Sequence, residues 1–237
     1  KLDSVVGMFI AGERPTGSRD PLGLRRQAQG VVRILADLPE ITGLATRLSL
    51  GPLLARAAEP FGGHGDSSAP LFSFIADRLG YLLDQRGYDV RNVRAVLHGG
   101  IAGVSPLEAR LKLEALAEMG GSEALLGVAT LLKRVKNITK GVDSSADWAA
   151  IQPQLVDPAE QALWTEVDAS APGIRSAAAS GDYRAAFAGV AGLRPAVATF
   201  FDDVLVMTDD EPLRRARLAL VATLRDLILG IADISEI

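Results

Sequence analysis

Apolar residues recur at intervals of three and four along most of the chain. Val31, Ile34, Leu35 and Leu38 form one such run. Residues at this spacing share one face of an α-helix. No convincing stretch shows the alternation of apolar and polar residues that is typical of a strand, and the abundant alanine, leucine and arginine favour helices. The pattern therefore predicts an all-α protein.

Three short motifs predict where helices begin. Each places a side-chain acceptor at the N-cap and proline at the first helical position: Asp20-Pro21, Ser105-Pro106 and Asp157-Pro158. Glu108 and Glu160 stand three residues after Ser105 and Asp157. This spacing predicts capping boxes, in which the two side chains of each pair bond to each other's backbone N–H groups.

Glycine marks two further breaks. Gly120-Gly121 followed by Ser122-Glu123 predicts the end of one helix and the start of the next. The segment Gly62–Pro70 has little helix propensity and little to bury. We therefore expect two domains, residues 1–66 and 67–237, with an exposed linker between them.

The composition narrows the class of protein. A chain of 237 residues with 48% hydrophobic content can build one large domain or two ordinary ones. The longest apolar stretches, such as Leu218–Ala222, fall far short of the roughly 20 residues that a membrane span needs. Cysteine is absent, which excludes disulfides, thiol catalysis and thiolate zinc sites. Because the sequence opens at Lys1 with no signal-peptide pattern, we expect a piece of a longer, soluble, cytoplasmic protein.

No motif in the sequence supplies a catalytic site. Gly12–Pro21 combines glycines with hydroxyl residues but lacks the spacing of a phosphate-binding loop, and Gly99–Gly103 does not reproduce a dinucleotide fingerprint. His64 and His98 lie too far apart in sequence to suggest a metal site. We expect the chain alone to be without catalytic activity.

Acidic residues cluster at Asp202-Asp203 and Asp209-Asp210-Glu211. Such a cluster could hold a divalent cation or provide acid–base groups. Helix capping explains the second group more simply, because Pro212 marks the start of a helix over Leu213–Leu229 and carboxylates are favoured at a helix N-terminus. We expect no metal site here.

The clearest basic patch is Leu131–Lys140, which carries four cations and no anion in a chain of net charge −4. Lys133, Arg134, Lys136 and Lys140 could contact a phosphate backbone, and an Asn137 amide within the same run could read a base edge. The charge pattern by itself fits an ordinary solvated helix face at least as well.

Three separated stretches of the chain match the motifs of one known family. The first comprises Lys1-Leu2-Asp3, Pro15-Thr16-Gly17-Ser18-Arg19-Asp20-Pro21 and Leu24-Arg25-Arg26. It resembles the pattern Lys-Leu-Asp, Pro-Thr-Gly-Ser-Lys-Asp-Pro and Leu-Arg-Arg of the beta subunit of the tetrameric bacterial glycyl-tRNA synthetase. The second, Lys133-Arg134-Val135-Lys136-Asn137-Ile138, resembles the Lys-Arg-Val-x-Asn-Ile motif of the family's anticodon-binding domain. The third resembles the closing helices of that domain and comprises Phe200–Met207, Leu213-Arg214 and Arg217–Leu220. Arg19 in place of lysine and Ala216 in place of asparagine are departures from the pattern.

This resemblance implies the helical end of an HD-like domain, followed by a DALR-type anticodon-binding helical bundle. Asp3 would match the last aspartate of the HD metal motif, whose other ligands would lie upstream of Lys1. The implied function is recognition of tRNA(Gly), including the anticodon, within a heterotetrameric glycine–tRNA ligase. The alpha subunit of that enzyme would hold glycine, ATP and Mg²⁺, and no catalytic residue is expected in this chain.

The resemblance also selects candidate tRNA contacts. They are the cations and the asparagine of the matching stretches: Lys133, Arg134, Lys136, Asn137, Lys140, Arg214, Arg217, Arg25 and Arg26. For Arg25 and Arg26, ion pairing with Asp20 and Glu40 is an equally good interpretation.

Two alternatives remain open at this stage. A helical protein-interaction scaffold without RNA contact would suit the acidic pI of about 5.3 and the apolar helix Leu218–Ile231. A remnant of an HD-type phosphohydrolase is suggested by Asp3 alone.

Overall fold

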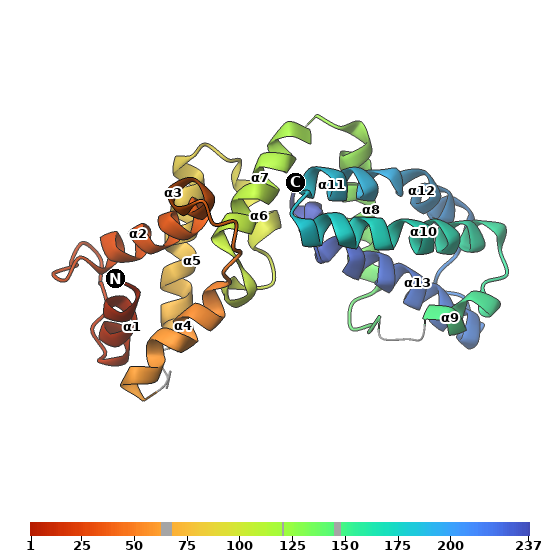
Figure 1. The fold of residues 1–237 in the computed structure, drawn as a ribbon. Coiled ribbons are helices and arrows are strands. Elements are labelled where there is room, and N and C mark those ends of the chain that lie inside the picture. The colour runs from red at the N-terminus through yellow and green to blue at the C-terminus, as the bar shows by residue number, and fades with distance from the viewer. Residues whose placement is uncertain (63–67, 120, 145–147) are drawn as a thin grey trace. The chain divides into compact units, whose positions relative to one another are not determined.

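A computed structural model describes residues 1–62, 68–119, 121–144 and 148–237 (Figure 1). Over these residues the chain forms helices and no strand, apart from an isolated antiparallel bridge between Thr16 and Arg19. The all-α prediction is confirmed. In the described part of the chain, no single helix is long and apolar enough to cross a membrane.

The chain divides into two compact units, Lys1–Leu113 (unit 1) and Glu114–Ile237 (unit 2). This division lies further along the chain than the expected boundary between residues 66 and 67. Most of the expected linker, with His64 and Asp66, lies outside the described residues, as does Gly120. Helix α5 (Ser68–Gln85) begins inside that expected linker, at Ser68, and packs against α2 (Leu24–Ala36) of unit 1. Composition marked a break between helices, but packing places the next helix in the same unit.

Unit 1 contains a succession of short helices and the first part of α7. The elements are α1 (Leu2–Ile10), α2, α3 (Leu38–Thr42), α4 (Leu50–Ala58), η1 (Glu59–Phe61), α5, α6 (Val90–Leu97), η3 (Ile101–Gly103) and α7 (Pro106–Met119). Helix α1 packs on α2 and α4, and α2 packs along α5. Helix α5 buries an apolar stripe that includes Leu71, Ile75 and Leu79. Helix α3 buries no residue, and Ile34 of the run predicted for α2 is 43% exposed, because α2 turns Ala28, Val32 and Ala36 to the core instead.

The start of α2 differs from the prediction. The sequence placed Asp20 at the N-cap and Pro21 in the first turn, whereas α2 begins at Leu24 after Gly23, which adopts a left-handed conformation with φ of 65°. Asp20 still satisfies the first backbone donors of the helix, because its carboxylate accepts hydrogen bonds from the N–H groups of Leu24 (2.8 Å) and Arg25 (3.0 Å). The capping chemistry was therefore predicted, but the register was three residues early.

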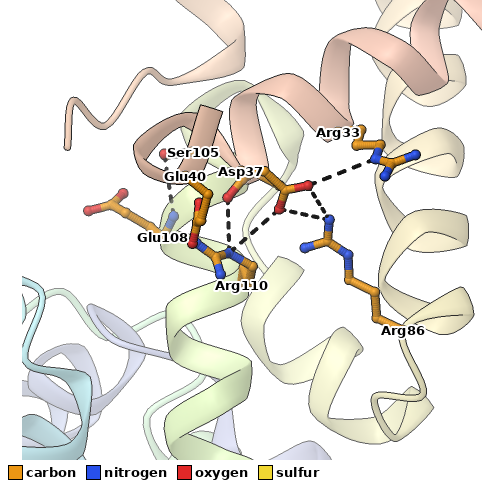
Figure 2. A network of polar contacts seen from close by, with 8 residues as sticks. Arg33, Asp37, Glu40, Arg86, Ser105, Glu108 and Arg110 are labelled. Atoms are coloured by element: carbon orange, nitrogen blue, oxygen red, sulfur yellow. Dashed lines mark hydrogen bonds and ion pairs between the residues drawn. The ribbon is translucent and has the colours of Figure 1, made fainter. Parts of the chain in front are cut away.

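A polar network joins the helix ends of unit 1 around Asp37 (Figure 2). Arg86, which follows α5, donates two hydrogen bonds to the Asp37 carboxylate at 2.8 and 2.7 Å. Arg110 of α7 donates to the Ala36 carbonyl at 2.9 Å and to Glu40 at 2.6 Å. These two arginines thereby hold the junction between α2 and α3 against α5 and α7.

Unit 2 is a bundle whose principal helices are α8, α10, α11, α12 and α13. The elements are α8 (Glu123–Ile138), α9 (Trp148–Ile151), η4 (Gln152–Gln154), α10 (Pro158–Ser180), α11 (Tyr183–Gly192), α12 (Arg194–Asp203), α13 (Glu211–Leu229) and η5 (Ile234–Glu236). Helix α8 packs on α11, α12 and α13, and α10 packs on the same three helices. Large buried side chains such as Leu132, Phe187 and Phe200 fill the space between them.

Most predicted helix starts are confirmed by the hydrogen bonds at the caps. Asp157 and Glu160 form the complete capping box of α10. Ser105 accepts from the N–H of Glu108 at 3.5 Å, and Ser122 accepts from the N–H of Leu125 at 3.3 Å. Asp210 accepts from the N–H of Leu213 at 3.1 Å, which accounts for one carboxylate of the second acidic cluster.

Candidate nucleic-acid interface

Helix α8 has one face in the core of unit 2 and one face in solvent. Leu125, Val128 and Leu132 are buried, whereas Lys133 and Asn137, four residues apart, are exposed. The periodicity of a helix explains this separation, because residues four apart lie on the same side. The predicted basic stretch therefore forms part of the exposed face of α8.

The end of α8 is held firmly in place. Thr139 is fully buried, and its hydroxyl donates to the Val135 carbonyl at 2.7 Å. Arg225 of α13 donates to the carbonyls of Thr139 (2.8 Å) and Val142 (3.2 Å) just beyond the helix. A guanidinium group at the negative end of a helix satisfies free carbonyls and complements the dipole. Lys140 is exposed in the turn that this contact fixes.

Lys136 lies on a different side of α8 from its basic neighbours. Its ammonium nitrogen lies 2.5 Å from Asp233 Oδ2 and 2.9 Å from Ser235 Oγ. Burial raises the pKa of Asp233, but the hydrogen bonds from Lys136 and Ser235 outweigh that effect and leave the pKa below its usual value. Lys136 fastens the C-terminal segment to α8, so a structural role replaces the tRNA contact expected from the sequence.

Arg134 contacts an aromatic ring of the neighbouring helix. Its guanidinium carbon lies 4.4 Å from the centroid of the Phe201 ring of α12, and the side chain remains exposed. A guanidinium stacked on a ring keeps the N–H groups at its edge available to other acceptors. The ring therefore orients Arg134 beside Lys133.

Three of the predicted residues present polar groups without a partner. Over the described part of the chain, the side chains of Lys133, Asn137 and Lys140 make no ion pair or hydrogen bond. Two ammonium groups and one amide, together with oriented Arg134, are thus available on one helix and the turn after it. This set can bind phosphate oxygens and the edge of an unstacked base.

The structure gives Arg217 another role. Arg217 is 9% exposed, and its Nε donates to the carboxylate of Glu160, which is completely buried. Its Nη1 also donates to the Leu205 carbonyl at 2.7 Å. The second oxygen of Glu160 accepts from the N–H groups of Val156 and Asp157. Because both ends of its guanidinium are engaged in the core, Arg217 is removed from the candidate tRNA contacts.

The remaining candidates are Arg214, Arg25 and Arg26. Arg214 is half-buried and donates to the Thr208 carbonyl at 2.9 Å, which fastens the loop before α13. Arg25 donates to the Gly17 carbonyl at 2.7 Å and belongs to unit 1, as does exposed Arg26. Within the described residues, neither forms an ion pair with Glu40, which pairs with Arg110 instead.

No metal centre emerges from the described residues, since no three of their His, Asp or Glu side chains come together in a group that could hold an ion. Residues that sequence reasoning missed include Phe201 and Arg225, which position the basic end of α8. Their contacts join α12 and α13 to α8. No short-range pattern in the sequence predicts these contacts, because the partners lie far apart along the chain.

The comparisons with known proteins agree with this division of the chain. Residues 1–98 match the model of the glycyl-tRNA synthetase beta subunit, and residues 128–235 match the model of the DALR anticodon binding domain. The glycine–tRNA ligase beta subunits of Acidithiobacillus ferrooxidans, Ralstonia nicotianae and Dechloromonas aromatica are 36%, 39% and 38% identical to the chain over 243, 240 and 240 residues.

These alignments cover 100% of this chain and 34%, 33% and 33% of the three relatives. The chain thus spans about a third of the length of the curated relatives it matches. The α8 stretch lies inside the part that matches the anticodon-binding model, and both family matches are to helical regions of the structure. The chain is therefore similar over its whole length to part of the glycyl-tRNA synthetase beta subunit, and its residues 128–235 match the DALR anticodon binding domain.

Proposed function

We propose that this chain recognises tRNA(Gly), including its anticodon, as part of the beta subunit of a glycine–tRNA ligase. The observation that carries the proposal is the exposed set Lys133, Asn137 and Lys140 on α8, whose side chains have no partner within the described residues. It lies in the domain that matches the anticodon-binding model.

The chemistry of this set suits an RNA loop. Bases in a loop are unstacked, so an amide side chain can reach their edges, while ammonium groups contact the adjoining phosphates. The net charge of −4 means that attraction to RNA must come from such local groups rather than from the whole surface.

Within the whole enzyme, binding of the small substrates and catalysis belong to another subunit in this proposal. The proposal places glycine, ATP and Mg²⁺ on an alpha subunit, in a cytoplasmic heterotetramer that attaches glycine to tRNA. The present chain contributes recognition and no catalytic residue. The scaffold alternative loses one of its supports, because the apolar helix Leu218–Ile231 is largely buried in unit 2.

Filter binding with tRNA(Gly) tests the proposal. Lys133→Gln/Lys140→Gln removes two unpaired charges from α8, and Arg175→Gln/Arg184→Gln removes two exposed charges from α10 and α11. The first variant should weaken binding and flatten its salt dependence by roughly 0.7 per lost single-strand contact, whereas the control should change neither. Equal behaviour of the two folded variants would move recognition away from α8.

A further inference from the structure

A groove in unit 1 gathers positive charge. It has a volume of about 510 Å³ and is lined by side chains from α2 and α5 together with Lys1. Its five cations are Lys1, Arg25, Arg26, Arg33 and Arg78, and no carboxylate belongs to its lining as far as the chain is described. We refer to it as the α2–α5 groove.

Most of this charge is not neutralised by neighbouring acids. Over the described ranges, Lys1, Arg26 and Arg78 form no ion pair with an Asp or Glu. Arg33 lies 4.0 Å from Asp37, but that carboxylate is bound more closely by Arg86 at 2.7 Å. Like charges gathered without counter-charges repel one another, so a bound anion would stabilise the arrangement.

Arg78 is held in place by two aromatic rings of α5. Its guanidinium carbon lies 5.9 Å from the centroid of the Phe74 ring and 5.7 Å from that of Tyr81. The Nε of Arg78 is buried and has no hydrogen-bond partner in the part of the chain that the structure describes. A buried donor without an acceptor is costly, so a shift of the Arg78 side chain toward an oxyanion in the groove would be favoured.

Two other groups in the lining favour a nucleotide chain over an isolated anion. The Oε1 of Gln29 is also buried without a partner among the described residues, and a rotation of the side chain lets it accept a hydrogen bond from a hydroxyl such as the ribose 2′-OH. Tyr81 is 50% exposed and offers a ring on which a base can stack. The cations of the groove would bind phosphate, Gln29 would bind a ribose hydroxyl, and Tyr81 would stack on a base.

We propose that the α2–α5 groove binds the phosphodiester backbone of RNA, so that the chain has a second RNA contact in unit 1. This inference rests on the proposed function, because it takes RNA to be the natural partner of the chain. The contact depends on backbone charge and on one aromatic ring, so it is independent of the anticodon sequence.

The groove can be tested with variants that remove charge without removing a buried partner. Lys1→Gln/Arg26→Gln neutralises two unpaired cations of the groove. Arg56→Gln/Arg91→Gln is the matched control, since these side chains are 81% and 63% exposed in unit 1 and belong to other helices. The groove variant of the whole chain should bind a tRNA transcript several-fold more weakly, with a salt slope lower by roughly 0.7–0.9 per lost contact. Identical slopes in groove variant and control would overturn the proposal.

Tyr81→Leu tests stacking, and the salt slope checks that Arg78, which keeps its contact with Phe74, still contributes its charge. It should weaken binding of poly(U) about fivefold or more while leaving the salt slope unchanged, because stacking on an aromatic side chain contributes without releasing counterions. An unchanged affinity would overturn the contact between Tyr81 and a base.

Poly(U) also distinguishes this inference from the function assigned to unit 2, because it has no glycine anticodon. If the groove variant loses affinity for poly(U) more than the control does, the groove contact stands even where anticodon discrimination fails. The last experiment measures whether inorganic phosphate or AMP competes with poly(U) for the groove. Millimolar phosphate or AMP binding to the groove, with no binding of poly(U), would identify a site for small phosphate ligands and overturn the RNA contact.

Discussion

Lys136 and Asp233 form an ion pair across 97 residues of sequence, with 2.5 Å between Nζ and Oδ2. The pair fixes the C-terminal segment on α8, and Ser235 completes it by hydrogen bonding to both residues. The basic run of α8 thereby divides into one cation that holds the fold together and others that face solvent.

Stability should depend on pH through Asp233. Its pKa is lowered in the folded protein, so the stabilisation is present above the ordinary Asp pKa of about 3.8 and is lost as the pH falls through the folded value. Asp233→Asn should lower the free energy of unfolding by about 1.5–3 kcal/mol at pH 6. The difference from wild type should shrink below pH 3.8. Both tryptophans of the sequence lie in unit 2, so tryptophan fluorescence during urea unfolding reports on this unit. If the difference in the free energy of unfolding between wild type and Asp233→Asn stayed constant from pH 6 to pH 3, the stabilising role of the Asp233 carboxylate would be contradicted.

Loss of the buried pair Arg217–Glu160 should destabilise the protein far more than loss of a surface pair. Arg217→Met leaves the completely buried Glu160 carboxylate without its cation, and we expect a loss of about 3–5 kcal/mol. Arg215→Met is the control, because Arg215 is 73% exposed and pairs with exposed Glu211. It should cost no more than about 1 kcal/mol. Urea unfolding followed by tryptophan fluorescence gives both values, and a similar cost for the two variants would refute the structural role of Arg217.

Gly51 should be required by the packing of α4 against η3. A Cβ at this position would lie 2.7 Å from the carbonyl oxygen of Ala102, which is backbone and cannot move aside cheaply. We expect Gly51→Ala to destabilise unit 1 by about 1–3 kcal/mol. Gly80→Ala on α5 meets no atom within 4 Å and should stabilise the helix by about 0.5–1 kcal/mol. The midpoint temperature of thermal unfolding, followed by circular dichroism, should fall for Gly51→Ala and rise for Gly80→Ala.

Asn137 should control specificity rather than general affinity. Asn137→Ala removes the amide that can pair with a base edge but leaves Lys133 and Lys140 in place. Discrimination between the glycine anticodon and a changed one should fall by about 1–3 kcal/mol, while the salt slope persists. Binding measured with both tRNAs over a range of salt concentrations tests this, after circular dichroism has shown that the variant is folded. Unchanged discrimination would assign base reading to other residues.

Much of the local structure could be predicted from the sequence. Helix periodicity and caps depend on residues within about four positions of one another, so Asp157 with Glu160, and Ser122 before α8, could be identified without tertiary information. Lys133, Asn137 and Lys140 are also close in sequence, so the sequence alone places them in one polar stretch. The start of α2 was placed too early, because the left-handed Gly23 extends the turn after Asp20.

The tertiary structure decided what each cation does. Lys136 and Arg217 resemble their basic neighbours in sequence, but their partners Asp233 and Glu160 lie 97 and 57 residues away. The packing of α5 on α2 likewise places α5 in unit 1, and the α2–α5 groove brings Lys1 together with Arg78. Local hydrogen bonding and helix periodicity act over a few residues, whereas burial and charge pairing depend on which helices meet in space. The sequence by itself therefore determined the helices and the position of the basic stretch, and only the fold separated structural cations from those available to RNA.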